Sequence, residues 1–142
     1  MTFRILVVED DAFLALFTEK LLKQAGHSVV GFANKAEKAV SMFQQLTAEG
    51  HAPDLVIMDI NLGPGADGIA AATQIRALDR HVAIVFFTAY ADTGTLVRAE
   101  AVAPRGIIRK PATAAEILRA VENVRNSTDA ARIQPLAGHV SA

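Results

Sequence analysis

Short runs of β-branched and aromatic apolar residues alternate along this chain with longer apolar segments of helical period, and this alternation leaves few possible folds. The short runs span residues 3–8, 27–32, 55–59, 82–88 and 106–109. Such runs predict strands, and their alternation with helical segments indicates parallel βα units. Five units are too few to close an eight-stranded barrel. The sequence therefore predicts an α/β fold with a doubly wound, open, five-stranded parallel sheet and five helices on its two faces.

The segments between the predicted strands carry apolar residues at helical spacing and begin at capping residues. Phe13, Phe17 and Leu21 lie four residues apart, which predicts that they share the apolar face of the first helix. Asn34 and Glu37 have the spacing of a capping box and predict the start of the second helix. The first, third, fourth and fifth helices are predicted at residues 11–25, 67–78, 92–103 and 113–124, and the fourth is expected to be the least stable because a glycine lies in its first turn.

Composition and charge exclude several classes of function. The chain has 142 residues, 51% of them apolar, which is enough for the core of one domain. Its net charge of −1 offers no attraction to nucleic acid or to an anionic membrane. The absence of Cys excludes disulfides, thiolate nucleophiles and zinc–thiolate sites. Neither a signal peptide nor an apolar stretch of about 18 residues is present, so a cytoplasmic protein is expected.

Polar residues stand where the predicted strands end. Glu9 and Asp10 follow the first strand, Asp59 and Thr88 end the third and fourth, and Lys110 follows the fifth. The carboxyl ends of parallel strands meet at one edge of an open sheet, so these side chains are expected to converge. Three carboxylates at one place repel each other unless a cation intervenes, and hard oxygen ligands suit Mg²⁺. The strand ends therefore predict a divalent-ion site.

Four of these segments, VVEDD, LVIMDI, FFTAY and IIRKP, resemble in order and separation the receiver domain of response regulators in two-component signalling. The resemblance covers residues 3 to about 125. It implies a flavodoxin-like sheet with strand order 2-1-3-4-5, Mg²⁺ as cofactor, and phosphorylation as the switch. Asp59 would accept a phosphoryl group from the phosphohistidine of a sensor histidine kinase or phosphotransfer protein, or from a small donor such as acetyl phosphate. Such a protein is a phosphoacceptor rather than a classical enzyme, although it catalyses its own phosphoryl transfer and slow dephosphorylation.

The same resemblance implies how the metal would be held. Asp10 and Asp59 would coordinate Mg²⁺ directly, the backbone carbonyl of Asn61 would supply a third ligand, and Glu9 would act mainly through water. A carboxylate nucleophile needs such an ion because its own charge opposes an anionic donor.

Further positions would hold the phosphate or modulate its lifetime. Lys110 would pair with one phosphate oxygen and the Thr88 hydroxyl would bond another, and the peptide between Lys110 and Pro111 would be cis. Asn61 and Tyr90 occupy the positions that influence the loss of phosphate. Ile107 replaces the aromatic residue that commonly precedes the lysine, so the usual aromatic switch is not expected.

The expected organisation is a receiver domain at residues 1–126 and a mobile tail at 127–142 without an output domain, because the apolar period is lost after residue 125. A stand-alone receiver would relay the phosphate or signal by a conformational change to a separate protein, which would contact the last two helices and the fifth strand. A homodimer is compatible with this reading.

Three other functions compete with that of a receiver. A docking module with a disused phosphorylation site has the same residues and remains open. A phosphatase of the haloacid dehalogenase type needs a second aspartate two residues after the first, where this chain has Asn61. A flavin carrier needs a phosphate-binding first turn, where the sequence is the acidic VVEDDAF.

Overall fold

The computed structural model of the chain describes residues 2–62, 67–89 and 92–138, with side chains up to residue 127. Its strands form one parallel sheet in the order β2-β1-β3-β4-β5. Their bounds are β1 Arg4–Val8, β2 Ser28–Ala33, β3 Leu55–Asp59, β4 Ala83–Thr88 and β5 Gly106–Arg109. This confirms the predicted α/β fold and the strand order 2-1-3-4-5.

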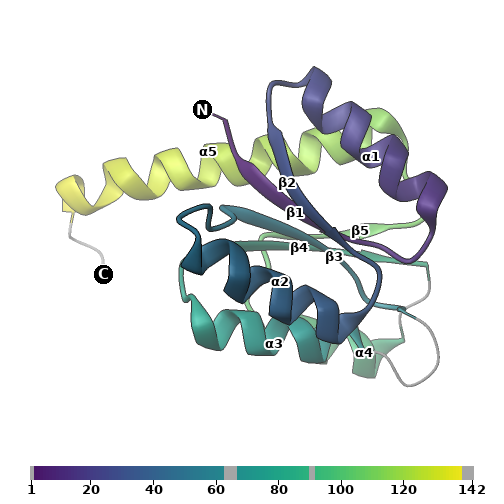
Figure 1. Cartoon of the computed structure of the whole chain (residues 1–142). Coiled ribbons are helices and arrows are strands. Elements are labelled where there is room, and N and C mark those ends of the chain that lie inside the picture. Colours follow the sequence, from purple (N-terminus) through teal and green to yellow (C-terminus); the bar gives the residue numbers. More distant parts are fainter. Residues whose placement is uncertain (1, 63–66, 90–91, 139–142) are drawn as a thin grey trace.

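Five helices cover the two faces of the sheet. Helices α1 and α5 lie on one face, and α2, α3 and α4 lie on the other (Figure 1). Their bounds are α1 Ala12–Gln24, α2 Ala36–Ala48, α3 Gly68–Leu78, α4 Thr93–Glu100 and α5 Ala114–Gly138. Among the residues that the structure describes, none of these helices combines the length and apolarity needed to span a bilayer.

Two hydrophobic cores lie on opposite faces of the sheet because successive side chains of a strand point in opposite directions. On β3, Val56 and Met58 enter the core under α2, α3 and α4, whereas Leu55 and Ile57 enter the core under α1 and α5. Every residue of β3 is buried, including its last, Asp59. This central strand therefore carries a carboxylate to the edge of the core.

The predicted apolar face of α1 is wrong in part. Leu21 is buried, but Phe13 is 88% exposed and Phe17 is 45% exposed. The residues of α1 that turn toward the sheet are Thr18, Leu21 and Leu22. Steps of four residues drift by about 40° per step around a helix of 3.6 residues per turn, so a stripe with this spacing leaves the buried face within two turns. An aromatic ridge on α1 is left at the surface.

The predicted capping box of α2 is also wrong, whereas α5 begins with a capping box. The N-cap of α2 is Lys35, which makes no side-chain cap bond, so Asn34 lies one residue before the cap and Glu37 is at N2 instead of N3. At the start of α5, the backbone N–H of Glu116 donates to Thr113 Oγ1 at 3.1 Å, and the N–H of Thr113 donates to Glu116 Oε1 at 2.8 Å.

The last two helices differ in length from the prediction. Helix α4 ends at Glu100, before the predicted residue 103, because Ala103 has a left-handed φ of 58° that a helix does not accommodate. Helix α5 continues to Gly138 and extends past the sheet (Figure 1). Its residues beyond 126 include the helix formers Ala, Arg and Gln but also Pro135, so local propensity does not account for the extra length. The mobility of residues 127–142 stays a prediction.

Arg76 of α3 fastens the edge of the sheet at which the strands begin. Its guanidinium donates to the backbone carbonyls of Val102 at 3.1 Å, Arg80 at 3.2 Å, Val82 at 2.5 Å and Ala103 at 3.3 Å. These carbonyls belong to the connections that precede β4 and β5. One side chain thus ties three segments together at the edge opposite Asp59.

A buried histidine joins β1 and β2 at the same edge. The backbone N–H of Phe3 donates to Nδ1 of His27 at 3.1 Å, and the two rings stack with centroids 5.4 Å apart. Burial lowers the pKa of His27, with a further lowering from the charge of Arg125. The imidazole is therefore held in its neutral form, which can accept the Phe3 hydrogen bond.

Candidate functional site

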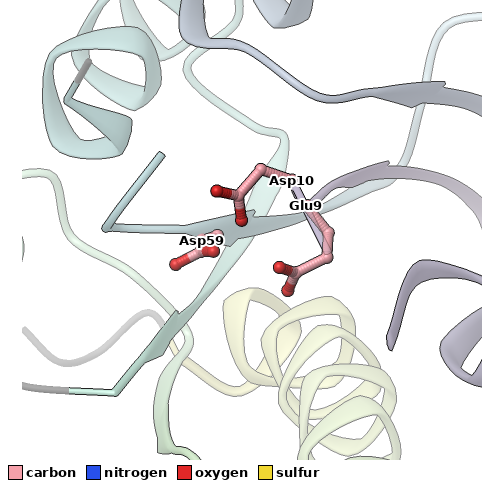
Figure 2. A group of neighbouring side chains, drawn as sticks. All are labelled: Glu9, Asp10 and Asp59. Atoms are coloured by element: carbon pink, nitrogen blue, oxygen red, sulfur yellow. The ribbon is translucent and has the colours of Figure 1, made fainter. Parts of the chain in front are cut away.

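Three carboxylates meet at the carboxyl ends of the two central strands. Glu9 and Asp10 follow β1, Asp59 ends β3, and the strands are adjacent with Val8 opposite Met58. One ligand oxygen from each of the three acids lies within 4.8 Å of the others (Figure 2). Glu9 and Asp59 are buried, whereas Asp10 is exposed. The expected juxtaposition of these acids is present.

Lys110 supplies the positive charge of the site. Its Nζ lies 3.1 Å from Asp59 Oδ2 and 2.9 Å from Glu9 Oε1, and its side chain is 17% exposed. Burial alone would lower the pKa of Lys110, but its hydrogen bond to Glu9 and the charge of Asp59 outweigh burial and raise it. Burial raises the pKa of Glu9, against the lowering effect of its bond to Lys110. The lysine is therefore charged and partly neutralises the acids.

Asp59 is oriented by its backbone surroundings as well as by the lysine. Its Oδ1 accepts a hydrogen bond from the backbone N–H of Asn61 at 2.9 Å. The side-chain oxygen of Asn61 accepts from the hydroxyl of Thr88 at 3.4 Å. Thr88 ends β4, which pairs with β3 so that Phe87 lies opposite Asp59. The hydroxyl and the carboxylate thus share Asn61 as a neighbour.

The turn after β3 returns very close to the site. Asn61 and Asp67 form an isolated antiparallel bridge, and the N–H of Gly68 donates to the Ile60 carbonyl at 3.1 Å. A Cβ at Gly68 would overlap the carbonyl oxygen of Asp59 and lie 2.9 Å from its carbonyl carbon. Only glycine fits here without a backbone shift, because the atoms it would meet are backbone atoms.

Asp67 links this turn to α4. Its Oδ1 caps α3 by accepting from the N–H groups of Ile69 and Ala70. Its Oδ2 pairs with the guanidinium of Arg98 on α4. The contribution of Gly68 depends on how the turn folds back onto Asp59, and that of Arg98 depends on Asp67, 31 residues earlier, so neither follows from the residues next to it in the sequence.

The structure describes most of the remaining predicted positions. The peptide between Lys110 and Pro111 is cis, as the resemblance implied. Ile107 is half-buried and packs against the core under α2, α3 and α4. Asn61 is exposed. Tyr90 lies outside the described residues.

The donor set fits Mg²⁺. Carboxylate oxygens are the hard ligands that this ion prefers, and one exposed acid leaves room for bound water. Among the described residues, no His or Cys belongs to this group of acids, so the chemistry of the ligands does not favour a softer metal. The Lys110 ammonium already neutralises part of the negative charge of these acids. A bound metal ion would have to share Glu9 and Asp59 with it.

Comparisons with known proteins point to one family. Residues 5–122 match the response regulator receiver domain. Transcriptional regulatory protein PdtaR of Mycobacterium tuberculosis is 34% identical over 119 residues, which cover 84% of this chain and 55% of that protein. Chemotaxis protein CheY of Bacillus subtilis is 32% identical over 126 residues, which cover 89% of this chain and 100% of that protein.

Solved structures of response regulators have the same fold. The crystal structure of a two-component response regulator of the LuxR family from Aurantimonas sp. matches with a TM-score of 0.76 and 30% identity, covering 87% of this chain and 85% of that one. The chain spans only about 55% of the length of PdtaR.

Proposed function

The chain belongs to the response regulator receiver domain family, and from this membership we propose that Asp59 accepts a phosphoryl group from a phosphohistidine and that the added charge signals to a partner protein. The observation that carries the proposal is the buried carboxylate of Asp59, with two further acids and a charged lysine around it. A carboxylate that only capped a turn would need neither the acids nor the lysine.

Asp10, Asp59 and the backbone carbonyl of Asn61 would hold Mg²⁺, with Glu9 acting through water. When bound, the ion supplies positive charge that lets an anionic nucleophile approach an anionic donor. The charge of Lys110, already at the site, acts in the same direction.

The transfer itself makes one bond and breaks one. A carboxylate oxygen of Asp59 attacks phosphorus, a P–O bond forms, and the P–N bond of the donor breaks with its electron pair leaving on the imidazole. Lys110 then shifts from the Asp59 carboxylate to a phosphate oxygen, and the Thr88 hydroxyl turns from Asn61 to another. Hydrolysis of the acyl phosphate later returns the protein to its resting state.

The surroundings of the site suit a protein donor. A hollow of about 500 Å³ beside Lys110 and Pro111 is lined by Phe13 and Phe17, which are 88% and 45% exposed. Apolar side chains exposed together in this way are typical of a docking surface. A sensor kinase or phosphotransfer protein would bury them while presenting its phosphohistidine to Asp59.

Intact mass after incubation with acetyl phosphate tests the proposal. We expect the wild type to gain one phosphoryl group with Mg²⁺ and none with chelator, and Asp59→Asn to gain none. Asp54→Asn is the matched control, because Asp54 lies at the opposite edge of the sheet, where it bonds Arg4.

The alternative is a receiver that serves only as a docking module. Failure of the wild type to gain mass from acetyl phosphate and from a phosphorylated histidine phosphotransfer protein would favour that alternative. Equal labelling of the wild type and Asp59→Asn would contradict the proposed nucleophile.

A further inference from the structure

A hollow of about 660 Å³ opens at the edge of the sheet where the strands begin, at the far end of β3 from Asp59. In Figure 1 this edge lies on the left, where β1 begins at the label N and α5 extends past the sheet. The floor of the hollow consists of buried apolar residues, which are Phe3, Pro53, Val82, Ala83 and Val124. Sites for small molecules usually have volumes of about 300–1,000 Å³, so this hollow is large enough for one.

The walls of the hollow are fixed by backbone hydrogen bonds. The N–H of Asp54 donates to the Arg4 carbonyl at 2.7 Å, and the N–H of Ala83 donates to the Asp54 carbonyl at 3.0 Å. On the other side, the N–H of Arg105 donates to the Ile84 carbonyl at 2.8 Å. A ligand that enters a preformed site of this kind pays little for ordering the protein.

The two carboxylates that line the hollow are already engaged by the chain itself. Asp54 Oδ2 accepts a hydrogen bond from the backbone N–H of Arg4 at 2.7 Å and lies 3.8 Å from Nε of the same residue. Asp79 Oδ1 accepts from the backbone N–H groups of His81 at 2.8 Å and Val82 at 3.2 Å. Both acids therefore serve to hold the walls.

Arg105 supplies a positive charge that is not matched in this way. Its exposed guanidinium lines the hollow and forms no hydrogen bond or ion pair with the part of the chain that the structure describes. A second guanidinium is close by, since the pKa of Arg76 is lowered by burial, raised by the charge of Asp79 and lowered by the charge of Arg105. Arg76 donates to backbone carbonyls, so an anion bound at Arg105 would reduce the repulsion between the two.

We infer that this hollow binds a small organic carboxylate, with the apolar body of the ligand on the floor and its carboxylate paired with Arg105. A guanidinium can hold a carboxylate through two parallel hydrogen bonds, and the imidazole of His81 on the rim offers a further donor. An inorganic anion could use Arg105 but would leave the apolar floor in contact with water. The inference goes beyond the proposed function and does not depend on it, because the hollow shares no residue with the acidic cluster around Asp59.

The test is an NMR titration of the unphosphorylated protein with phenylpropionate, a carboxylate that carries one aromatic ring. We expect a Kd on the order of 1 mM, with shifts at the starts of β1, β4 and β5. Arg105→Met should weaken binding at least about threefold, a modest factor because the ion pair is exposed. Arg109→Met is the matched control, since it removes another exposed arginine that lies outside the hollow, and it should keep the affinity of the wild type. Thermal melting checks that both variants are folded.

Two further probes separate the charge of the ligand from its apolar body. Phenylpropanol has the same ring and chain without the charge, and acetate has the charge without the ring. Each should bind at least about threefold more weakly than phenylpropionate, because each lacks one of the two contacts that the hollow offers.

The inference would be overturned by an absence of shifts at about 10 mM phenylpropionate, or by shifts that lie elsewhere. Equal binding of acetate or of phenylpropanol would also overturn it, as would an affinity that is unchanged in Arg105→Met or equally reduced in Arg109→Met. Shifts that depend on protein concentration without any probe would assign the hollow to a second copy of the chain and would contradict a small ligand.

Discussion

Replacing Gly68 by Ala should damage both stability and phosphorylation. The new Cβ would overlap the carbonyl oxygen of Asp59, and it would lie 2.9 Å from the carbonyl carbon of Asp59 and 3.0 Å from Cα of Ile60. Carbon atoms in contact prefer about 3.5–4.0 Å, so the turn must move away from Asp59. Such overpacking costs about 1–3 kcal/mol, whereas Ala in a helix gains at most about 1 kcal/mol over Gly. Because the overlap is with backbone atoms, the cost lies at the upper end of this range, and the expected net loss is about 2 kcal/mol.

The displaced turn should also misplace the site. Asn61 is bridged to Asp67, directly before Gly68, and donates to the Asp59 carboxylate. A misplacement of about 1 Å can reduce a rate on the order of 100-fold, so phosphorylation by acetyl phosphate should slow by about 10-fold to 100-fold.

Urea unfolding and time-resolved intact mass measure the two effects. Gly94→Ala, in the first turn of α4, is the matched control, because among the described residues its Cβ would meet only the Asp92 carboxylate, at 3.6 Å. It should gain up to about 1 kcal/mol and keep its phosphorylation rate. A Gly68→Ala protein with the stability and phosphorylation rate of the wild type would refute the reasoning.

Four further perturbations have defined outcomes. Lys110→Ala should still bind Mg²⁺, as measured by NMR, but should lose the chemical-shift changes that phosphorylation causes in α4 and β5. If these changes are retained, Lys110 does not transmit the signal. Arg76→Met should lower the free energy of unfolding in urea by about 2–3 kcal/mol, because several backbone carbonyls lose a charged donor. Arg80→Met should change this free energy by less than about 0.5 kcal/mol, and equal losses in the two variants would contradict the role of Arg76. Because the pKa of His27 lies below its ordinary value of 6.5 in the folded state, protons bind the unfolded state more readily. Stability should hold above about pH 6.5 and fall below it, and His27→Gln should flatten that part of the profile; an unchanged slope would exclude His27 as the cause. Ile107→Tyr should alter the β5 and α5 shifts on phosphorylation more than the rate of phosphoryl uptake, and a reversed order would exclude Ile107 from switching.

The sheet and the gathering of the acids could be predicted because both follow from local patterns and topology. The bounds of β3 and β5 match the prediction, since continuous apolar runs end sharply at polar residues. Once the strands are parallel, their carboxyl ends share one edge, so Glu9 and Asp59 meet although 50 positions separate them in the sequence.

The wrong predictions and the contacts that were not predicted depend on tertiary packing. The burial of Phe13 and Phe17 was predicted from spacing alone, but the orientation of α1 is decided by how its whole length packs on the sheet. The close approach of Gly68 to Asp59 and the pairing of Arg98 with Asp67 are tertiary contacts, which no pattern within either segment indicates.

The hydrogen bonds of Arg76 hold the edge of the sheet at which the strands begin, and no such side chain is described at the edge that carries Asp59. The bonds of Arg76 to the carbonyls of Val102 and Ala103 hold the chain directly after α4, while the start of α4 lies toward the site. Helix α4 has 8 residues and is therefore about 12 Å long. A tilt of about 10° around the held end would swing the free end by about 2 Å. A displacement beside Asp59 would therefore be largest at the start of α4 and would fade toward the held carbonyls of Val102 and Ala103.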